Sequence, residues 1–129
     1  MIKLPRRRDG SAQAGSAAER AAEQWLRRQG LSTVARNFRC PLGEIDLVMS
    51  DGPQLVFVEV RLRNRSDYGG AAASVTRAKQ QRLIRAAGVF LGDHPRWRQA
   101  ACRFDVLAGR HHNGELEWQW LRDAFAADF

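Results

Sequence analysis

Hydrophobic and polar positions alternate through the middle of the chain and predict a β-hairpin. In residues 43–48 and 55–63, branched apolar side chains recur at every second position, which is the period of a strand. The intervening residues 49–54 contain Asp-Gly-Pro, which is turn chemistry, and its proline could not lie in a central strand. We therefore expect two antiparallel strands joined by a short turn.

A hairpin that is symmetric about the centre of this turn has a definite register. It places Asp46 directly opposite Glu59 and Glu44 directly opposite Arg61, with all four side chains on one face. Opposed like charges destabilise a sheet, so the two acids need a cation. Arg61 could supply one positive charge in a salt-bridge ladder on a solvated face, or a divalent metal could bridge both carboxylates. The flanking apolar run 55–58 favours burial of the acids and hence a functional site.

The remaining pattern gives one helix before the hairpin and one after it. The predicted order is a helix from Ser16 that ends before Gly30, a strand over 34–40, the hairpin, a polar Gly-rich loop over 64–70, a helix over 74–91, a strand over 102–107, and a second hairpin ending in a strand over 116–120. The tail 121–129 is predicted to form a short helical turn. A helix between two strands suits a crossover into a parallel neighbour, so we expect an α/β fold with a mixed sheet.

Composition and charge narrow the class of partner. At 129 residues, the chain is predicted to hold one domain over 16–129, preceded by a basic mobile tail over 1–15. It carries 21 Lys and Arg against 14 Asp and Glu, a net charge of +7, which favours a polyanionic partner such as nucleic acid. No apolar run approaches the length of a spanning helix, so we expect a cytoplasmic protein with no membrane partner.

The predicted second helix is the clearest candidate surface for phosphate. No acidic residue occurs between Val75 and Leu91, so its outer face carries one sign of charge. We expect nucleic-acid contacts from Arg77, Lys79 and Arg82 of this helix and from Arg63 at the end of the hairpin. A solvated charged face of an amphipathic helix is the alternative.

The hairpin residues carry a family resemblance. GEIDLV followed by FVEVRLR resembles the YraN family of uncharacterised bacterial proteins, whose members are similar to PD-(D/E)xK nucleases and Holliday-junction resolvases, and the resemblance covers the chain from about Gly15 to Leu107. It implies a restriction-endonuclease-like core in the order α-β-β-β-α-β, here with an additional C-terminal strand. In the superfamily pattern, the first acid matches Asp46, the second matches Glu59, and Arg61 fills the position of the lysine.

The resemblance also gives Glu19 a second interpretation. As the residue three positions after Ser16, Glu19 completes a capping box at the start of the first helix. As a family position, it matches the glutamate that completes the acidic cluster of resolvase-like nucleases. Both interpretations are open from the sequence, whereas Glu23, one turn later, is expected at the surface.

Three functions are compatible with these residues. In the first, Asp46, Glu59 and the Val60 carbonyl hold Mg²⁺ or Mn²⁺ in an endonuclease-like phosphodiesterase that acts on DNA, with branched DNA as a candidate substrate; Glu19 assists and Arg61 stabilises charge on phosphorus. A homodimer would suit cutting the two strands of a junction. In the second, the protein binds nucleic acid without cleaving it, since a guanidinium cannot act as a base. In the third, the basic tail and the tryptophans bind another protein.

Overall fold

A computed structural model of the chain describes residues 10–63 and 75–127, and it confirms the α/β fold class. The elements in chain order are α1 (Gly10–Arg28), β1 (Ser32–Cys40), β2 (Gly43–Asp51), β3 (Gln54–Arg63), α3 (Arg77–Asp93), a 3-10 turn η1 (Pro95–Trp97), β4 (Cys102–His112) and β5 (Glu115–Phe125). This order is the predicted α-β-β-β-α-β core with one additional strand at the C-terminus. None of the helices described is long and apolar enough to span a bilayer.

The five strands form one mixed sheet in the order β1-β2-β3-β4-β5. Only β3 and β4 are parallel, as expected for strands joined through a helix, and the other neighbouring pairs are antiparallel. The β2–β3 ladder runs from Asp51 opposite Gln54 to Leu47 opposite Val58, which is the register predicted from the turn. It ends there, so the two strands separate before Asp46 and Glu59 would pair.

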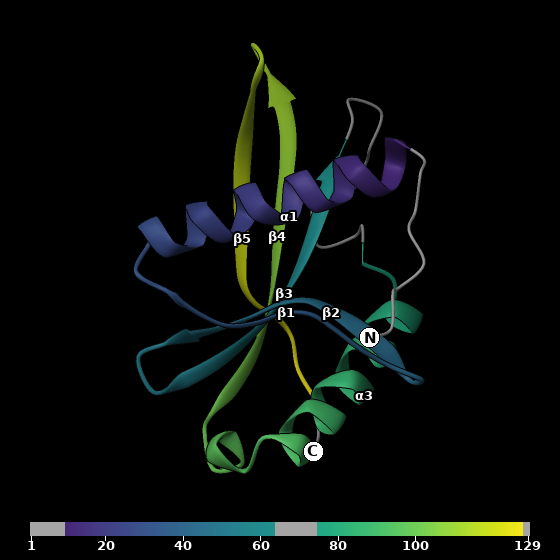
Figure 1. Cartoon of the computed structure of the whole chain (residues 1–129), viewed down its shortest axis with the longest axis vertical. Coiled ribbons are helices and arrows are strands. Elements are labelled where there is room, and N and C mark those ends of the chain that lie inside the picture. Colours follow the sequence, from purple (N-terminus) through teal and green to yellow (C-terminus); the bar gives the residue numbers. More distant parts are fainter. Residues whose placement is uncertain (1–9, 64–74, 128–129) are drawn as a thin grey trace, which may run out of the picture.

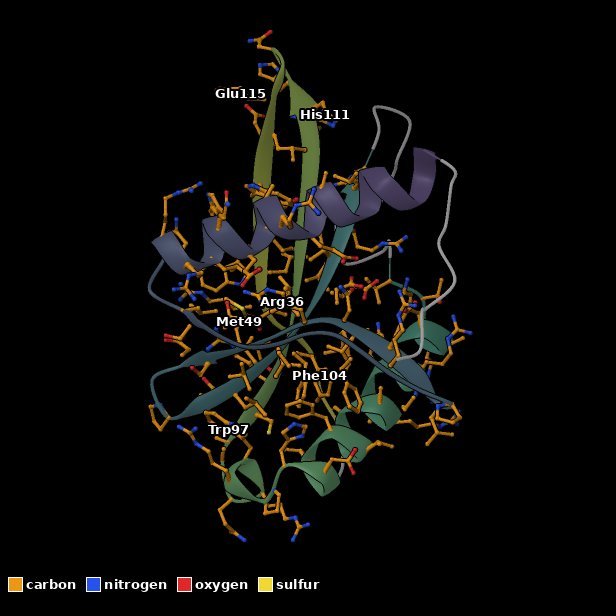
Figure 2. The ribbon with its side chains drawn as sticks, in the orientation of Figure 1. Arg36, Met49, Trp97, Phe104, His111 and Glu115 are labelled. Atoms are coloured by element: carbon orange, nitrogen blue, oxygen red, sulfur yellow. The ribbon has the colours of Figure 1, made fainter. Side chains whose placement is uncertain are left out.

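The two helices cover opposite faces of the first three strands (Figure 1). Ala22 and Leu26 of α1 pack against one face of the sheet, where Met49 lies. Phe90 of α3 packs against the other face, where Phe104 lies. Figure 2 shows Met49 on the α1 side of the β1–β2 ribbon and Phe104 on the α3 side. The tip of the β4–β5 hairpin extends past α1, on the side away from α3 (Figure 1).

Strand β2 changes its orientation at Asp46. Ile45 packs in the core on the α3 side, whereas Leu47, two residues later, packs in the core on the α1 side. In a regular strand both would share a face. Across the sheet, Asn37 of β1 has a φ of 50°, a left-handed conformation that bends this strand beside the same point. The sheet is therefore bent at the position of Asp46.

Two predicted helix starts are wrong. Helix α1 begins at Gly10 rather than at Ser16, because alanine is frequent in this stretch and is the strongest helix former. Of the predicted mobile tail, residues 1–9 lie outside the described part of the chain. Helix α3 begins at Arg77 rather than at Ser74, because the Thr76 side chain accepts a hydrogen bond of 3.2 Å from the Lys79 N–H and caps the helix there.

The predicted helical turn at the C-terminus is also wrong, because β5 continues to Phe125. Phe125 pairs with Phe104 on β4, and their rings stack with centroids 5.0 Å apart. An irregularity at Asp123, which has a φ of 52°, lets the strand bend and keep this contact. The predicted Gly-rich loop over 64–70 lies outside the described residues.

Candidate functional site

The separation of β2 and β3 opens a fork in the sheet, and Asp46 fills it. The Val60 N–H, which would otherwise donate to β2, donates to Asp46 Oδ2 over 2.9 Å. In a strand, the N–H and the C=O of one residue point to the same side. The Val60 carbonyl therefore faces the same fork, on the side of β3 away from β4.

Glu59 lies beside Asp46 and is 4% exposed. Among residues 10–63 and 75–127, two cations approach its carboxylate: Lys79 Nζ lies 2.9 Å from Glu59 Oε2, and Arg61 Nη1 lies 3.8 Å from the same atom. Lys79 belongs to the first turn of α3, so the close counter-ion comes from a helix rather than from the strand. The sequence had suggested Arg61 for this role.

Burial and mutual repulsion shift the acids toward their protonated forms. Burial, together with the charge of Asp46, raises the pKa of Glu59 to about 7, although Lys79 opposes the shift. Burial also raises the pKa of Asp46, and the hydrogen bond from the Val60 N–H opposes that shift. A hydrogen bond between the two side chains adds to the raised pKa of Glu59 and opposes the rise at Asp46. Near neutral pH the pair thus retains a proton that isolated carboxyl groups would have lost.

Glu19 reaches Asp46 from α1. Burial raises its pKa to about 7, and the charge of Asp46 and a hydrogen bond with it add to the shift. Because α1 begins at Gly10, Ser16 lies inside the helix and cannot be its N-cap, so the capping-box interpretation is wrong. We call Glu19, Asp46, Glu59 and Lys79 the acidic site.

The donor set of the acidic site matches a hard divalent cation. Two carboxylates and the Val60 carbonyl offer oxygen ligands, which Mg²⁺ and Mn²⁺ prefer, with water completing the coordination. Among the described residues, no three Asp, Glu, His or Cys side chains lie close enough together to hold a metal ion. The direct ligands would be Asp46, Glu59 and Val60, with Glu19 acting through its hydrogen bond to Asp46.

The site also contains an unmet donor. The Nε of Arg61 is buried and has no hydrogen-bond partner within residues 10–63 and 75–127. A buried donor without a partner costs free energy, so such groups often await a ligand. An oxyanion beside Glu59 would satisfy it.

The four residues predicted to contact nucleic acid are not equivalent in the structure. Arg77 and Arg82 are exposed on α3, as expected for phosphate contacts, and Arg63 is half-buried at the end of β3. Lys79 instead forms the ion pair inside the acidic site. Sequence reasoning missed that role because no spacing links position 79 to position 59; only the fold brings the start of α3 to this end of β3.

Glu23 is buried rather than at the surface, contrary to expectation. Its carboxylate accepts hydrogen bonds from Thr33 Oγ1 over 2.6 Å and from Arg36 Nε over 2.8 Å. The Arg36 hydrogen bond lowers the pKa of Glu23, the opposite of the shift at Glu19. Glu23 thus ties α1 to β1, and this contact fixes the helix that carries Glu19 over the fork.

Comparison with known proteins identifies the family. The model of the uncharacterised protein family UPF0102 matches residues 18–108. UPF0102 proteins of Halorhodospira halophila and Pseudomonas putida are 52% and 51% identical, over 92% and 87% of this chain and 91% and 92% of the relatives. A UPF0102 protein of Methylobacillus flagellatus is 50% identical over 89% of this chain and 98% of its own length. The chain belongs to the UPF0102 family, which is the YraN family that the sequence resembles.

Proposed function

We propose that the protein is a metal-dependent endonuclease that acts on DNA, with branched DNA as the candidate substrate. The observation that carries the proposal is the Asp46–Glu59 pair in the β2–β3 fork, in which Glu59 is buried and Asp46 half-buried, with raised carboxyl pKa values and a lysine ammonium against Glu59. Carboxylates that repel one another away from water lower the stability of the fold, so stability does not explain why they are there. Such sites are frequent at functional centres.

Asp46, Glu59 and the Val60 carbonyl would hold Mg²⁺ or Mn²⁺. When bound, the ion supplies Lewis-acid stabilisation of phosphate oxygens and lowers the pKa of bound water. Metal binding should strengthen as the pH rises, because the carboxyl groups must lose their protons before they can bind the ion. Glu19, through Asp46, orients that carboxylate and is a positioning residue in this scheme.

Lys79 and Arg61, which both approach Glu59 Oε2, would act on the substrate. Once Glu59 engages a cation, the Lys79 ammonium has less charge to compensate and can donate to a phosphate oxygen or to the attacking water. An amine can also transfer a proton, which a guanidinium does not. Arg61, whose Nε has no partner among the described residues, would donate to the charged phosphoryl group. The exposed Arg77 and Arg82 would position the backbone.

A second candidate function has its own supporting observation. Lys79 already neutralises Glu59 at 2.9 Å, and no three metal-binding side chains converge among the described residues. A protein with this arrangement could bind DNA with the same fold and basic surface while cleaving it slowly or not at all.

Calorimetric titration of Mn²⁺ at pH 8 tests the proposed metal site. We expect one ion per chain for the wild type and no measurable binding for Glu59→Gln. Glu117→Gln is the matched control, because Glu117 is an exposed acid of β5, 53% exposed, paired with Arg110 far from the fork. Equal Mn²⁺ binding by wild type and Glu59→Gln would reject the site assignment.

Cleavage assays then separate the two candidate functions. We expect Mg²⁺-dependent cleavage of a four-way junction or flap by the wild type under single-turnover conditions. Asp46→Asn should lose it, and Arg61→Ala should lower the rate by roughly 10²–10³, the scale for one preorganised donor. Metal binding and salt-dependent DNA binding without any cleavage would instead support the non-cleaving module.

A further inference from the structure

A pocket of about 390 Å³ opens beside the acidic site, between the β1–β2 turn and the first half of α3. Its lining comes from both sides of that gap, with Arg39, Pro41, Leu42 and Glu44 from the turn and Lys79 and Arg82 from α3. Lys79 belongs to both places, because its ammonium pairs with Glu59 while its side chain lines the pocket. The pocket is therefore the immediate neighbour of the phosphate that the acidic site would bind.

The turn that forms one wall of the pocket is held tightly against the helix. A Cβ atom added to Gly43 would lie 2.7 Å from the Arg82 carbonyl oxygen, so the two backbones pack closer than any side chain permits. On the turn itself, the Cys40 thiol donates to the Gly43 carbonyl over 3.4 Å. This close packing makes the pocket a preformed feature of the fold.

The lining combines two chemistries. Pro41, Leu42 and Leu83 give an apolar wall, and Leu42 is 49% exposed, one of two large apolar side chains that the described chain leaves this open. Arg39, Lys79 and Arg82 place three cations around it. A ligand with a flat apolar part and an attached phosphate matches both at once.

Arg39 can be recruited by such a phosphate. Its present partner is Glu44, with Arg39 Nε 3.4 Å from Glu44 Oε2 and both side chains 65% exposed. An exposed ion pair of this kind contributes little, so exchange for a phosphate contact costs little. A bidentate arginine–phosphate contact is stronger than the pair it would replace.

The size of the pocket selects among nucleic-acid ligands. A volume of 390 Å³ lies in the range of small-molecule pockets, about 300–1,000 Å³, and suits a single nucleotide. A base pair within a duplex cannot enter it without leaving its stack. The shape thus favours an unpaired nucleotide, such as one at a flap, a gap or the branch point of a junction.

We propose that the pocket between the β1–β2 turn and α3 binds one unpaired nucleotide next to the phosphate held at the acidic site, and so directs the protein to the boundary between duplex and single strand. The base packs on Pro41 and Leu42, the exposed part of the apolar wall, and its phosphate contacts Arg39 and Arg82. This inference rests on the proposed nuclease-like function and specifies its substrate class.

Fluorescence anisotropy with two labelled DNAs tests the inference in the presence of Ca²⁺, so that cleavage does not interfere. One probe is a blunt duplex and the other carries the same duplex with a short single-stranded flap. We expect the wild type to bind the flap probe about tenfold more tightly, equivalent to about 1.4 kcal/mol. Leu42→Ser and Arg39→Ala should remove most of this preference and leave blunt-duplex affinity within about twofold. Arg110→Ala is the matched control for Arg39→Ala, because Arg110 is also an exposed arginine paired with a glutamate, at 3.6 Å on the β4–β5 hairpin.

The outcomes distinguish failure of the nucleotide pocket from failure of the proposed nuclease function. Equal affinity for the two probes, or a flap preference that survives Leu42→Ser and Arg39→Ala, overturns the nucleotide pocket. Mn²⁺ titration of the same preparations reports on the acidic site alone. Loss of the preference in the pocket variants together with wild-type Mn²⁺ binding supports both the pocket and the nuclease proposal. Loss of the preference in the pocket variants without Mn²⁺ binding by the wild type supports the pocket and rejects the nuclease proposal. Gly43→Ala gives an independent check, since its Cβ displaces the turn and should also reduce the flap preference.

Discussion

Two buried acidic clusters lie on neighbouring strands of this sheet, and they are compensated very differently. Asp105 of β4 has no exposed surface, yet each of its carboxylate oxygens has several donors. Arg103 Nε lies 3.0 and 3.2 Å from the two oxygens, Trp120 Nε1 donates over 2.9 Å, and the Asp123 N–H donates over 2.9 Å. The Asp105 cluster is a closed network that links β4 to β5 and, through Arg103, to Asp51 and Gln54 at the β2–β3 turn.

The acidic site is open by comparison. Within the described residues, Asp46 accepts one backbone N–H, Glu59 has Lys79 at 2.9 Å and Arg61 at 3.8 Å, and the acids also interact with one another. Hydrogen bonding that satisfies a buried charge stabilises a fold, whereas incomplete compensation leaves binding capacity for a ligand. Burial alone does not distinguish a structural carboxylate from a functional one; the number and charge of its partners do.

The largest expected effect comes from opening the closed network. Asp105→Ala leaves Arg103, which is 11% exposed, with Asp51 and Gln54 as its partners in the part of the chain that the structure describes. Removing one member of a buried ion pair lowers the free energy of unfolding by about 3–5 kcal/mol. Urea denaturation followed by circular dichroism measures the loss. Trp120→Phe, which removes a single donor, should cost only about 1–2 kcal/mol.

A loss below about 1 kcal/mol for Asp105→Ala would contradict the comparison, because it would mean that the closed network does not stabilise the fold. Mn²⁺ binding per folded molecule should be unchanged in both variants, since neither residue belongs to the acidic site.

The pH dependence of stability gives the second expected effect. Raised carboxyl pKa values mean that the folded chain binds more protons than the unfolded chain between the ordinary glutamate pKa of 4.5 and about 7. The contribution of these groups to stability is therefore fully present below that pH window. The metal-free protein should lose stability as the pH rises through the window. Thermal melts from pH 4.5 to pH 8 with chelator should show this fall, and saturating Mn²⁺ should reverse it at pH 8.

Asp46→Asn sharpens this test. The amide can still accept the Val60 N–H but carries no charge, so Glu19 and Glu59 ionise more easily. At pH 8 with chelator, the variant should be more stable than the wild type by roughly 1–2 kcal/mol, the scale of about one pKa unit. At pH 4.5 the two proteins should melt alike. A variant that is less stable than the wild type at both values would assign the pair a structural role, as for Asp105.

The geometry of the two clusters explains why the sequence predicted the acidic site and not the Asp105 cluster. The turn chemistry fixed the β2–β3 register, and that register brought Asp46 and Glu59 to the same place although the ladder ends before them. The Asp105 cluster was not predicted, because its partners depend on where β5 returns along β4, and residues 121–125 were expected to be helical. The role of Lys79 was not predicted for the same reason: it depends on how α3 docks, which local periodicity does not encode.

The smallest expected effect distinguishes the two cations at Glu59. Arg61 Nη1 is 3.8 Å from Glu59 Oε2 and the side chain is 33% exposed, whereas Lys79 Nζ is 2.9 Å from the same oxygen. The longer contact contributes less, so Arg61→Ala should change the free energy of unfolding by less than about 1 kcal/mol with chelator at pH 8. Lys79→Met should cost more, because it removes the close counter-ion, and should raise the pKa of Glu59 further. Carboxyl chemical shifts of Glu59 followed by NMR across pH 5–9 would report that change in pKa directly.

If Arg61→Ala proved the more destabilising of the two variants, or moved the Glu59 titration further than Lys79→Met, Arg61 would be the structural counter-ion. Arg61 would then not be available to a phosphate, and the acidic site would resemble the closed network around Asp105.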